Sequence, residues 1–463
     1  MKKIYAISLF TFTFSLFTYL CEAQYSVIHF FNGPTGKYPW GSVTISGHKI
    51  YGMSTGGDNI FVMDTDGSNF RNLHFFNDTA GSSPYGALTI SGGKIYGMTS
   101  AGGTYKWGVI FSMDTSGSNY KVLLNFNDTN GGDPQGSLIL FGDTLYGMTL
   151  RGGLSLWDGC VFSIDTNGSG FKDILDFNGL NGSGPCGTPT LSGGVLYGMT
   201  ASGGVYNYGC IFSVKTNGSG YKDIVDFNTG KGGGGIGDIV LSGNKFYGMS
   251  SNGGTHGYGS VYSVNINGSG LKTLISFNDT TGNYPRGDVA VIGSKLYGTT
   301  EYGGPQGPFS EGLIFSIDTD GTSYADLHDF LFTSGENPVG NLTLSGNIFY
   351  GMAEDGGGAN LGVVFGFNYV AAGINEINGN GGIVKGYPNP SAGKFAIEMK
   401  NDKLKVKIIE VTNVLGEKVY SQFVNSNSKF EIDLSSNPNG VYFYRIIAEN
   451  ADLLGIGKVV IEK

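Results

Sequence analysis

Short apolar segments separated by turn residues recur along most of the chain. One stretch shows the pattern clearly: GALTISG from Gly86, KIYGMTS from Lys94, GVIFSMDT from Gly108 and YKVLLNF from Tyr120. Each segment has the length and the β-branched or aromatic content of a strand, and long helical patterns are absent. The pattern predicts a unit of four short strands.

This four-segment unit occurs seven times. The dipeptide Tyr-Gly marks the same place in every unit, with successive spacings of 45, 50, 51, 50, 50 and 53 residues. It lies at Tyr51, Tyr96, Tyr146, Tyr197, Tyr247, Tyr297 and Tyr350. A period of about 50 residues belongs to propeller-type arrays, so the repeats predict β-propeller blades.

The two ends of the repeat array complement each other. The seventh repeat has three segments, starting at Gly340, Asn347 and Gly362, and lacks the fourth. The missing segment matches YSVIHFFN from Tyr25. We therefore expect an all-β fold with a seven-bladed β-propeller over residues 24–370, closed by the N-terminal strand, which leaves no exposed sheet edge. An open β-solenoid is the alternative, although it needs no complementary ends.

The connections between segments alternate in length. The first and third are tight, Gly-rich or Asp-Gly turns typical of hairpins. The second and fourth are longer and rich in Gly, Pro and Asn. In an up-and-down sheet the second and fourth connections share one end, so all long loops are expected on one face.

The composition supports strands and tight turns. Glycine contributes 81 of 463 residues, aromatic residues 13% and charged residues only 14%. The formal net charge is -9, with scattered acids and no basic stripe. Such a chain lacks the electrostatic footprint for phosphate backbones, and no nucleic-acid partner is expected.

The N-terminus has the features of a secretory signal peptide. Two lysines precede an uncharged run over residues 4–20, and Cys21-Glu22-Ala23 offers a small-residue cleavage site. We predict a signal peptide over residues 1–23. A lipoprotein anchored at Cys21 is the alternative, although the bulky residues before it do not resemble a lipobox.

Three cysteines remain after cleavage, at Cys160, Cys186 and Cys210. The odd number excludes a complete disulfide framework but leaves one bridge open. Because Cys160 and Cys210 occupy the same place in neighbouring repeats, small buried residues are the simpler interpretation.

The composition changes after the repeats. Residues 371–386 are rich in Gly and Asn and predict a linker. Beyond them, alternating segments start at Lys394, Lys405, Lys429 and Val441. They predict a small C-terminal β-sandwich over residues 387–463.

Four motifs in this C-terminal region are similar to the type A sorting domain of the type IX (Por) secretion system. They are Tyr387-Pro388-Asn389-Pro390-Ser391, residues 413–419 around Gly416, Pro438-Asn439-Gly440-Val441-Tyr442 and Gly457-Lys458-Val459-Val460. The resemblance implies the type IX machinery as a partner. It also implies passage through the periplasm, a location outside the cell or on its surface, and then cleavage of the domain with release or attachment to lipopolysaccharide.

The repeats, over residues 25–370, resemble the GloVer-type tandem repeats of exported bacterial proteins. The recurring LYGMT, GG and FN elements carry this resemblance. It implies a propeller-like fold and brings no known catalytic residues. No compact catalytic, zinc or P-loop signature occurs in the sequence, and no cofactor or metal is expected. The turns at Asp64 and Asp318 look like calcium loops but lack the downstream acid, so hairpin turns explain them better.

Residues that depart from the repeat are the candidates for function. One set is aromatic and falls on the long-loop face: Trp40, Trp107, Trp157, Tyr105 and Tyr208. These rings are expected either to bind a glycan or protein ligand or to cap the gaps between blades.

The other set is acidic: Glu301, Glu311, Glu336, Glu354 and Asp355, all expected in long loops of blades 6 and 7. Carboxylates gathered there would suit binding of a cation or acid/base chemistry on glycans, although solvated charge is commoner. The leading hypothesis is a non-enzymatic extracellular binding or adhesion propeller. The alternatives are a secreted carbohydrate-active hydrolase or lyase using these carboxylates, and a structural surface-layer component.

Overall fold

The computed structural model describes residues 24–155, 157–228, 233, 235, 237–305, 311–369, 384–399, 406–413, 418–423, 429–448 and 453–463. The chain divides into two compact units, residues 23–370 and a unit that includes residues 371–463. Every element in the described part is a strand, so the fold is all-β. The signal peptide predicted over residues 1–23 lies outside the described residues.

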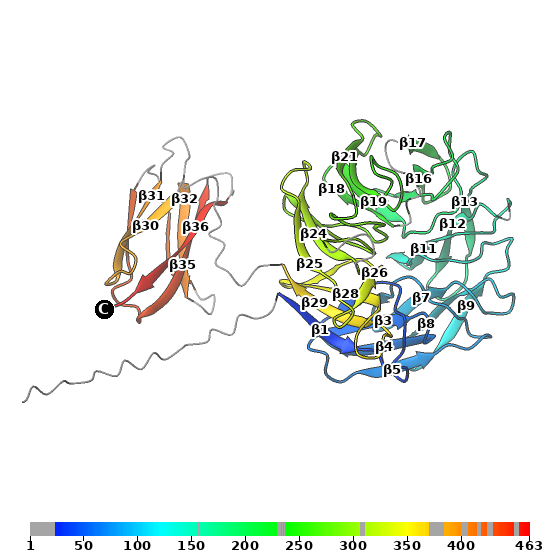
Figure 1. Cartoon of the computed structure of the whole chain (residues 1–463), viewed down its shortest axis with the longest axis horizontal. Coiled ribbons are helices and arrows are strands. Elements are labelled where there is room, and N and C mark those ends of the chain that lie inside the picture. The colour runs from blue at the N-terminus through cyan, green and yellow to red at the C-terminus, as the bar shows by residue number, and fades with distance from the viewer. Residues whose placement is uncertain are drawn as a thin grey trace, which may run out of the picture. The chain divides into compact units, whose positions relative to one another are not determined.

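Six consecutive four-stranded antiparallel sheets make up most of the first unit (Figure 1). The first contains β2 (Thr44–Ser46), β3 (Lys49–Ser54), β4 (Asn59–Asp64) and β5 (Arg71–Phe75). The second contains β6 (Thr89–Ser91), β7 (Lys94–Thr99), β8 (Val109–Asp114) and β9 (Lys121–Asn125). The third contains β10 (Ile139–Phe141), β11 (Thr144–Thr149), β12 (Cys160–Asp165) and β13 (Lys172–Asp176).

The next three sheets follow the same order. The fourth contains β14 (Thr190–Ser192), β15 (Val195–Met199), β16 (Cys210–Lys215) and β17 (Lys222–Asp226). The fifth contains β18 (Ile239–Ser242), β19 (Lys245–Ser250), β20 (Ser260–Asn265) and β21 (Lys272–Ser276). The sixth contains β22 (Ala290–Ile292), β23 (Lys295–Thr300), β24 (Leu313–Asp318) and β25 (Ala325–Asp329).

A seventh sheet joins the two ends of the repeat array. It contains β27 (Thr343–Ser345), β28 (Ile348–Asp355), β29 (Val363–Asn368) and the N-terminal strand β1 (Tyr25–Phe30). Strand β1 pairs antiparallel with β29, from Tyr25 opposite Phe367 to Phe30 opposite Val363. A further short strand, β26 (Glu336–Pro338), pairs with the end of β28.

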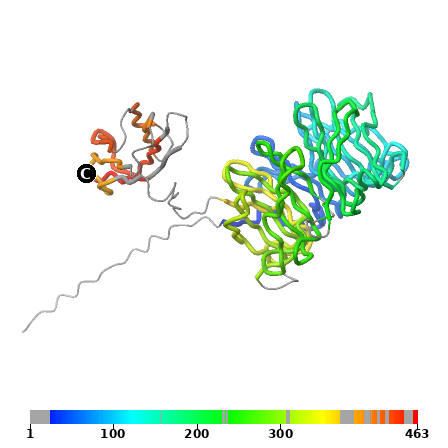
Figure 2. The backbone as a smooth tube through the Cα atoms, turned by 90° about the horizontal axis from the view of Figure 1, so that it is seen from above, coloured from blue at the N-terminus to red at the C-terminus, as the bar shows by residue number. Residues whose placement is uncertain are grey.

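Apolar side chains between consecutive sheets form the core of the unit. Phe76 of the first repeat packs with Leu88 and Phe111 of the second, and related clusters follow along the array. Tyr350 and Met352 of the seventh sheet pack in the same way against Phe61 of the first. The last sheet, in yellow, therefore lies beside the first, in blue, in both views (Figures 1 and 2).

Seven glycines surround the centre of this unit, and we call them the axial ring. They are Gly41, Gly86, Gly136, Gly187, Gly237, Gly287 and Gly340. A Cβ on any of them would lie 2.1 to 2.9 Å from the carbonyl oxygen of the next ring glycine, and Gly340 faces Gly41 in this way. Glycine is required at each place because a side chain would collide with the neighbouring backbone.

Three of the five histidines lie on outer strands, where they contact the following repeat. The rings of His29, His74 and His328 stack on Phe70, Tyr120 and Tyr25, with centroids 3.8 to 4.1 Å apart. Burial lowers the pKa of each imidazole, to about 4 for His29. Neutral imidazoles thus act as packing groups between sheets.

The second unit is a sandwich of two antiparallel sheets. One contains β30 (Val384–Tyr387), β31 (Lys394–Met399) and β34 (Lys429–Asp433). The other contains β33 (Lys418–Phe423), β32 (Val406–Asn413), β35 (Gly440–Ala448) and β36 (Leu453–Ile461). Their inner faces share a buried core that includes Ile397, Ile409 and Leu434, as expected for sheet-on-sheet packing.

Strand β30 begins at Val384, so the last residues of the predicted linker 371–386 belong to the sandwich. Residues 371–383 lie outside the described part of the chain. Within the described part, no helix is long and apolar enough to cross a membrane.

Candidate functional site

The candidate aromatic residues have different environments. Trp157, Tyr105 and Tyr208 are 66%, 55% and 42% exposed. Trp107 packs against a core cluster, and its ring covers Gly132, where a Cβ would lie 2.8 Å from a ring atom. Trp107 is thus a packing residue that fills the gap to the next repeat, which was the alternative role expected for these rings.

The exposed rings lie in equivalent loops of three consecutive sheets, between strands β7 and β8, β11 and β12, and β15 and β16. These loops also expose Leu154, Val205 and Tyr206, at 84%, 73% and 55%. We call these three loops the aromatic loops. Their exposed apolar side chains are Tyr105, Leu154, Trp157, Val205, Tyr206 and Tyr208. The antiparallel strand order places them on the same face as the loops that lead into β6, β10 and β14.

Trp40 has a different role, because it lines a pocket at the centre of the repeat unit. This axial pocket is formed by the residues on either side of the axial-ring glycines. The residues that precede the glycines differ between repeats and include Trp40, Tyr85, Gln135, Cys186, Arg286 and Val339. The repeat sequence held a signal for this pocket, because the residue before each ring glycine changes although a proline precedes that residue in six of the seven repeats.

Arg286 contacts two aromatic rings and a carboxylate at the axial pocket. Its guanidinium lies 5.0 Å from the ring centroid of Trp40 and 4.8 Å from that of Tyr284. It also forms an ion pair with Glu301, which is 3% exposed. Glu301 is thus a buried, charge-compensated carboxylate. The tryptophan ring of Trp40 in turn packs edge-on against Tyr85 at 5.5 Å.

Glu354 follows Ala353 as Glu301 follows Thr300, at the end of the second strand of the adjacent sheet. Burial is the largest cause that raises its pKa to about 7, followed by the negative charges of Asp355 and Glu301. The positive charge of Arg286 opposes this rise. A carboxyl group with this pKa exchanges its proton near neutral pH.

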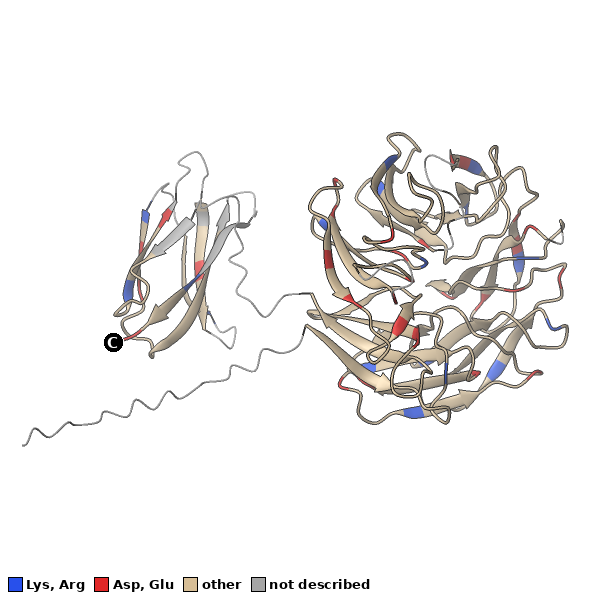
Figure 3. Cartoon of the chain, in the orientation of Figure 1, with Lys and Arg blue, Asp and Glu red and all other residues tan. Residues whose placement is uncertain are grey.

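The remaining acids form a second group. Glu336 lies opposite Asp355 in the pairing of β26 with β28. Burial, with the charge of Glu311 and a hydrogen bond to it, raises the pKa of Glu336 to about 7. Burial also raises the pKa of Asp355. The five acids therefore belong to the sixth and seventh repeats, and Glu336, Glu354 and Asp355 lie on the paired strands β26 and β28. Figure 3 shows the Asp and Glu positions along the chain.

The prediction that all five acids lie in loops is wrong for three of them. Glu336 belongs to β26, and Glu354 and Asp355 belong to β28. The physical reason is the pairing between the two segments. Among the described residues of the second to sixth repeats, the equivalent segments form one isolated bridge each, such as Gly132 with Arg151, whereas two residue pairs extend the strand here.

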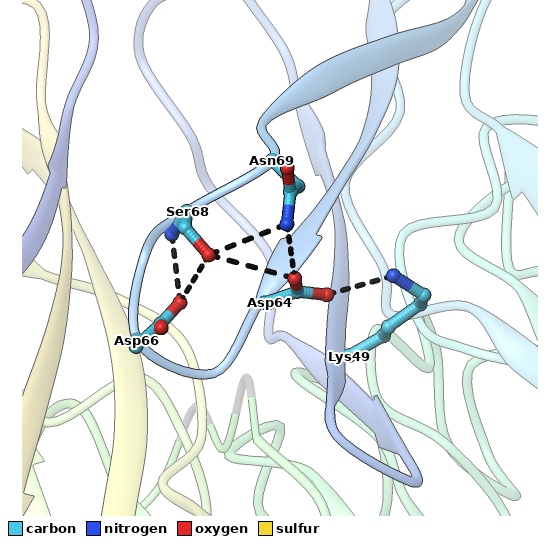
Figure 4. A network of polar contacts seen from close by, with 5 residues as sticks. All are labelled: Lys49, Asp64, Asp66, Ser68 and Asn69. Carbon is cyan, nitrogen blue, oxygen red and sulfur yellow. Dashed lines mark hydrogen bonds and ion pairs between the residues drawn. The ribbon is translucent and has the colours of Figure 1, made fainter.

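The aspartate turns that resemble calcium loops are satisfied by protein donors. Asp64 accepts hydrogen bonds from Lys49 Nζ at 2.7 Å and from Asn69 Nδ2 at 2.6 Å (Figure 4). Asp66 accepts from the backbone N–H of Ser68 at 2.9 Å. These contacts stabilise the hairpin. Among the residues described, no group of three or more His, Cys, Asp or Glu side chains is arranged to hold a metal ion.

The three cysteines, Cys160, Cys186 and Cys210, are buried free thiols. Burial raises the pKa of the Cys186 thiol to about 12, so this group stays protonated at neutral pH. The bridge left open by the sequence is thus not formed here.

The sorting motifs from the two ends of the sandwich meet. The Asn389 side chain accepts a hydrogen bond from the Val460 N–H at 2.8 Å and donates one to the Lys458 carbonyl at 3.0 Å. Pro388 and Pro390 flank Asn389 in the chain. The Lys429 ammonium lies 5.6 Å from the ring centroid of Tyr387. Asn389 of the first sorting motif is thus hydrogen-bonded to the last strand, β36.

The other sorting-motif glycines occupy one strand pair. Gly440 lies opposite Ile461 and Gly457 opposite Tyr444, in the pairing of β35 with β36. Gly416 lies outside the described residues.

Comparison with known proteins is consistent with these two units. Residues 11–200 and 187–379 match the Gloeobacter/Verrucomicrobia repeat, and residues 385–462 match the secretion system C-terminal sorting domain. No curated protein matches the sequence significantly.

Several solved structures show a distant likeness. PorZ, a bacterial surface component of the type IX secretion system of Porphyromonas gingivalis, is 13% identical, with 91% of this chain and 65% of PorZ covered and a TM-score of 0.33. YCF48 from Cyanidioschyzon merolae is 11% identical, with coverage of 75% and 99% and a TM-score of 0.48. The extracellular domain of a one-component system of B. thetaiotaomicron is 13% identical, with coverage of 86% and 47% and a TM-score of 0.49.

The repeat match spans well over half of the chain, and the tail match covers the whole sandwich. The tail marks a substrate of type IX secretion, destined for the cell surface or the extracellular space. The chain therefore belongs to the Gloeobacter/Verrucomicrobia repeat family and carries a C-terminal secretion sorting domain.

Proposed function

We propose that the repeat unit is a closed seven-bladed β-propeller that binds a ligand outside the cell without chemical conversion. Closure is supported by the pairing of β1 with β29 and by the approach of Gly340 to Gly41. The sorting domain supplies the route to the surface. The signal peptide over residues 1–23 is part of this proposal, as the first step of export.

The observation that carries the binding function is the exposure of the aromatic loops. Large apolar side chains gathered on one surface mark interaction sites, and these occupy equivalent places in three consecutive repeats. Tyr and Trp rings provide a wide apolar face together with a polar edge. Trp157 also has the guanidinium of Arg151 at 5.7 Å from its ring centroid, which adds hydrogen-bond donors beside the ring.

We propose a glycan as the ligand of this surface. A row of sugar rings offers apolar faces for stacking and hydroxyl groups for the polar edges of the tyrosines. A protein ligand would use the same rings as anchors, and the binding test below separates the two. In this proposal the axial pocket, with Trp40 beside Arg286, is a second contact on the same face.

A catalytic function rests on different residues. The pKa of about 7 for both Glu336 and Glu354 suits a general acid. Against this function, the Glu301 carboxylate is already engaged in an ion pair with Arg286. We therefore place glycan cleavage second.

Glycan-array binding and calorimetric titration of the protein test the proposal. Trp157→Ala and Tyr206→Ala are expected to weaken binding at least about tenfold each, as loss of an aromatic anchor does. Phe141→Ala is the matched control, because Phe141 is 64% exposed but precedes a hairpin on the opposite face. Equal binding by all three variants would reject the aromatic loops as the site. Binding of a protein but no glycan would change the ligand class.

Release of sugar from a polysaccharide tests the catalytic alternative. No release is expected. Release that is lost in Glu336→Gln or Glu354→Gln would replace the binding function with an enzymatic one.

A further inference from the structure

The sandwich has two outer faces, and among its described residues only one of them exposes large apolar side chains. Phe423 and Phe443 are 73% and 47% exposed, and both belong to the sheet of β33, β32, β35 and β36. The other sheet, of β30, β31 and β34, instead exposes charged side chains of both signs, such as Lys394 and Glu431. The two faces therefore differ in chemistry.

The strand pairing places the two phenylalanine rings on the same side of their sheet. On β35, Phe443 alternates with tyrosines that are buried in the core, so its ring points away from the core. On β33, Phe423 lies opposite Ile408, which precedes the buried Ile409. We call the outward side of this sheet the outer sheet face. It includes Lys418, Phe423, Val441, Phe443, Lys458 and Val460.

Two of the sorting motifs reach the outer sheet face from β35 and β36. In these motifs Tyr442 and Val459 lie opposite each other and are buried in the core. Val441 and Val460, the next pair along the strands, point the other way because side chains alternate across a sheet. Lys458, two residues from Val460, shares their side. The core accounts for the inward residues of these motifs but not for the outward ones.

A third sorting motif, residues 413–419, contributes Lys418 to the same face. Lys418 lies opposite Thr412, next to the buried Val411, so its side chain also points outward. Outward side chains from three separate motifs thus gather on one side of one sheet. Because these side chains lie outside the core, contact with a partner explains why they belong to the motifs.

The outer sheet face is basic. Glu410 is 5% exposed and accepts hydrogen bonds from Lys418 Nζ and Arg445 Nε, each at 2.6 Å. Among the described residues in the strands of this sheet, Glu410 is the one carboxylate, whereas Lys418, Arg445 and Lys458 are cations. The face therefore complements a partner surface that carries acidic side chains.

We infer that the outer sheet face is the surface that the type IX export machinery contacts, through a part of the machinery that combines acidic side chains with apolar pockets. The tail match supplies the partner, since it marks a substrate of type IX secretion. Phe443 with the neighbouring Val441 and Val460 fits the apolar centre of an interface, and the cations fit its charged rim. This surface is separate from the aromatic loops and does not depend on the proposed ligand.

Export of the full chain from cells with a type IX system tests this inference. Phe443→Ser and Lys458→Glu are each expected to lower the amount of repeat unit outside the outer membrane at least about fivefold, as loss of an interface anchor does. Both should keep the calorimetric transition of the sandwich, because the side chains point away from the core. Lys394→Glu is the matched control, since Lys394 is an exposed lysine of the other sheet, and it should be exported normally. Wild-type export of both folded face variants would overturn the inference.

Photo-crosslinking in the same cells decides the matter if a variant folds poorly. A photoreactive phenylalanine analogue in place of Phe443 keeps an aromatic ring on the outer sheet face, and the same analogue in place of Glu431 probes the other sheet. Adducts with components of the outer-membrane export machinery, identified by mass spectrometry, are expected from position 443 and not from position 431. Equal adducts from both positions, or none from position 443, would overturn the inference.

Discussion

Arg286 donates from its guanidinium Nε to the carboxylate of Glu301, a residue that is only 3% exposed. The two residues lie 15 positions apart, one beside an axial-ring glycine and one directly after β23. The pair fixes the guanidinium over the rings of Trp40 and Tyr284. A carboxylate that the sequence suggested for catalysis thus orients the wall of a pocket.

Breaking this ion pair is expected to destabilise the repeat unit. Arg286→Met leaves the Glu301 carboxylate buried without a partner and should cost about 3 kcal/mol. Glu301→Gln keeps a hydrogen-bond acceptor, and Arg286 retains 21% side-chain exposure, so about 2 kcal/mol is expected. Urea unfolding of each variant measures these costs.

The double variant separates a pairwise contact from general loss of packing. Arg286→Met with Glu301→Gln removes both charges, and its destabilisation should be at least about 1 kcal/mol smaller than the sum of the single variants. Strict additivity would show that the two side chains do not interact in solution.

The contribution of Glu354 to stability is expected to fall as pH rises to neutrality. The folded-state pKa of Glu354, about 7, lies above the ordinary glutamate value of 4.5. The folded state therefore binds this proton more tightly than the unfolded chain does. Its contribution is complete below about pH 4.5 and is lost as pH passes 7. After allowance for solvent screening, about 1–2 kcal/mol is expected for this group.

Glu354→Gln tests this dependence, because glutamine stays neutral at all pH values. The melting temperature of the variant relative to that of the wild type should therefore rise between about pH 5 and pH 8. Asp66→Asn serves as the control, since hydrogen bonds from Ser68 lower the pKa of Asp66. An equal change of melting temperature with pH in Glu354→Gln and the wild type would contradict the assignment.

The close packing of the axial-ring glycines predicts that a single added methyl group there lowers the stability of the repeat unit strongly. A Cβ on Gly136 would lie 2.1 Å from the carbonyl oxygen of Gly187. Gly136→Ala must displace the backbone of the neighbouring sheet and should cost about 3 kcal/mol or more. Gly358→Ala meets open space and should change the stability by less than about 0.5 kcal/mol. Equal unfolding midpoints for the two variants would exclude close packing at the axis.

Much of the fold could be predicted because each repeat carries its own strand pattern. The segments that start at Lys94 and Gly108 became β7 and β8. The incomplete seventh repeat predicted a partner for the segment at Tyr25, and β1 pairs with β29. These features depend on local alternation and on turns, which the sequence displays directly.

The candidate site was harder to predict because it depends on small shifts between repeats. Trp107 and Trp157 lie in equivalent loops, but the second loop is one residue longer. Asp158 consequently takes the structural place of Trp107. The Asp158 carbonyl accepts a hydrogen bond from the Gly184 N–H, just as the Trp107 carbonyl accepts one from the Asp133 N–H. The extra residue leaves Trp157 exposed. Arg286 was missed because its partners come from three different loops.

Within the sorting domain, Asn389 is expected to hold the first motif to the last strand. Asn389→Ala removes the hydrogen bonds to Val460 and Lys458 and should cost the sandwich about 1–2 kcal/mol. The calorimetric transition of this unit in the full chain should move to lower temperature while that of the propeller stays. Glu431→Ala is the control, because Glu431 is exposed on β34. A shift of the propeller transition instead would contradict the assignment of Asn389 to the sandwich alone.

Export is expected to depend on the sandwich and not on the repeat unit. The sorting match covers residues 385–462, and strand β30 starts at Val384, so deletion of residues 384–463 removes the whole signal together with its first strand. The truncated chain should retain the propeller fold, since β1 and β29 form their pairs within residues 25–368. It should accumulate inside the outer membrane, as measured by protease accessibility on intact cells. Gly136→Ala with an intact tail separates misfolding from loss of sorting. Surface display of the truncated chain at the wild-type level would reject the tail as the export signal.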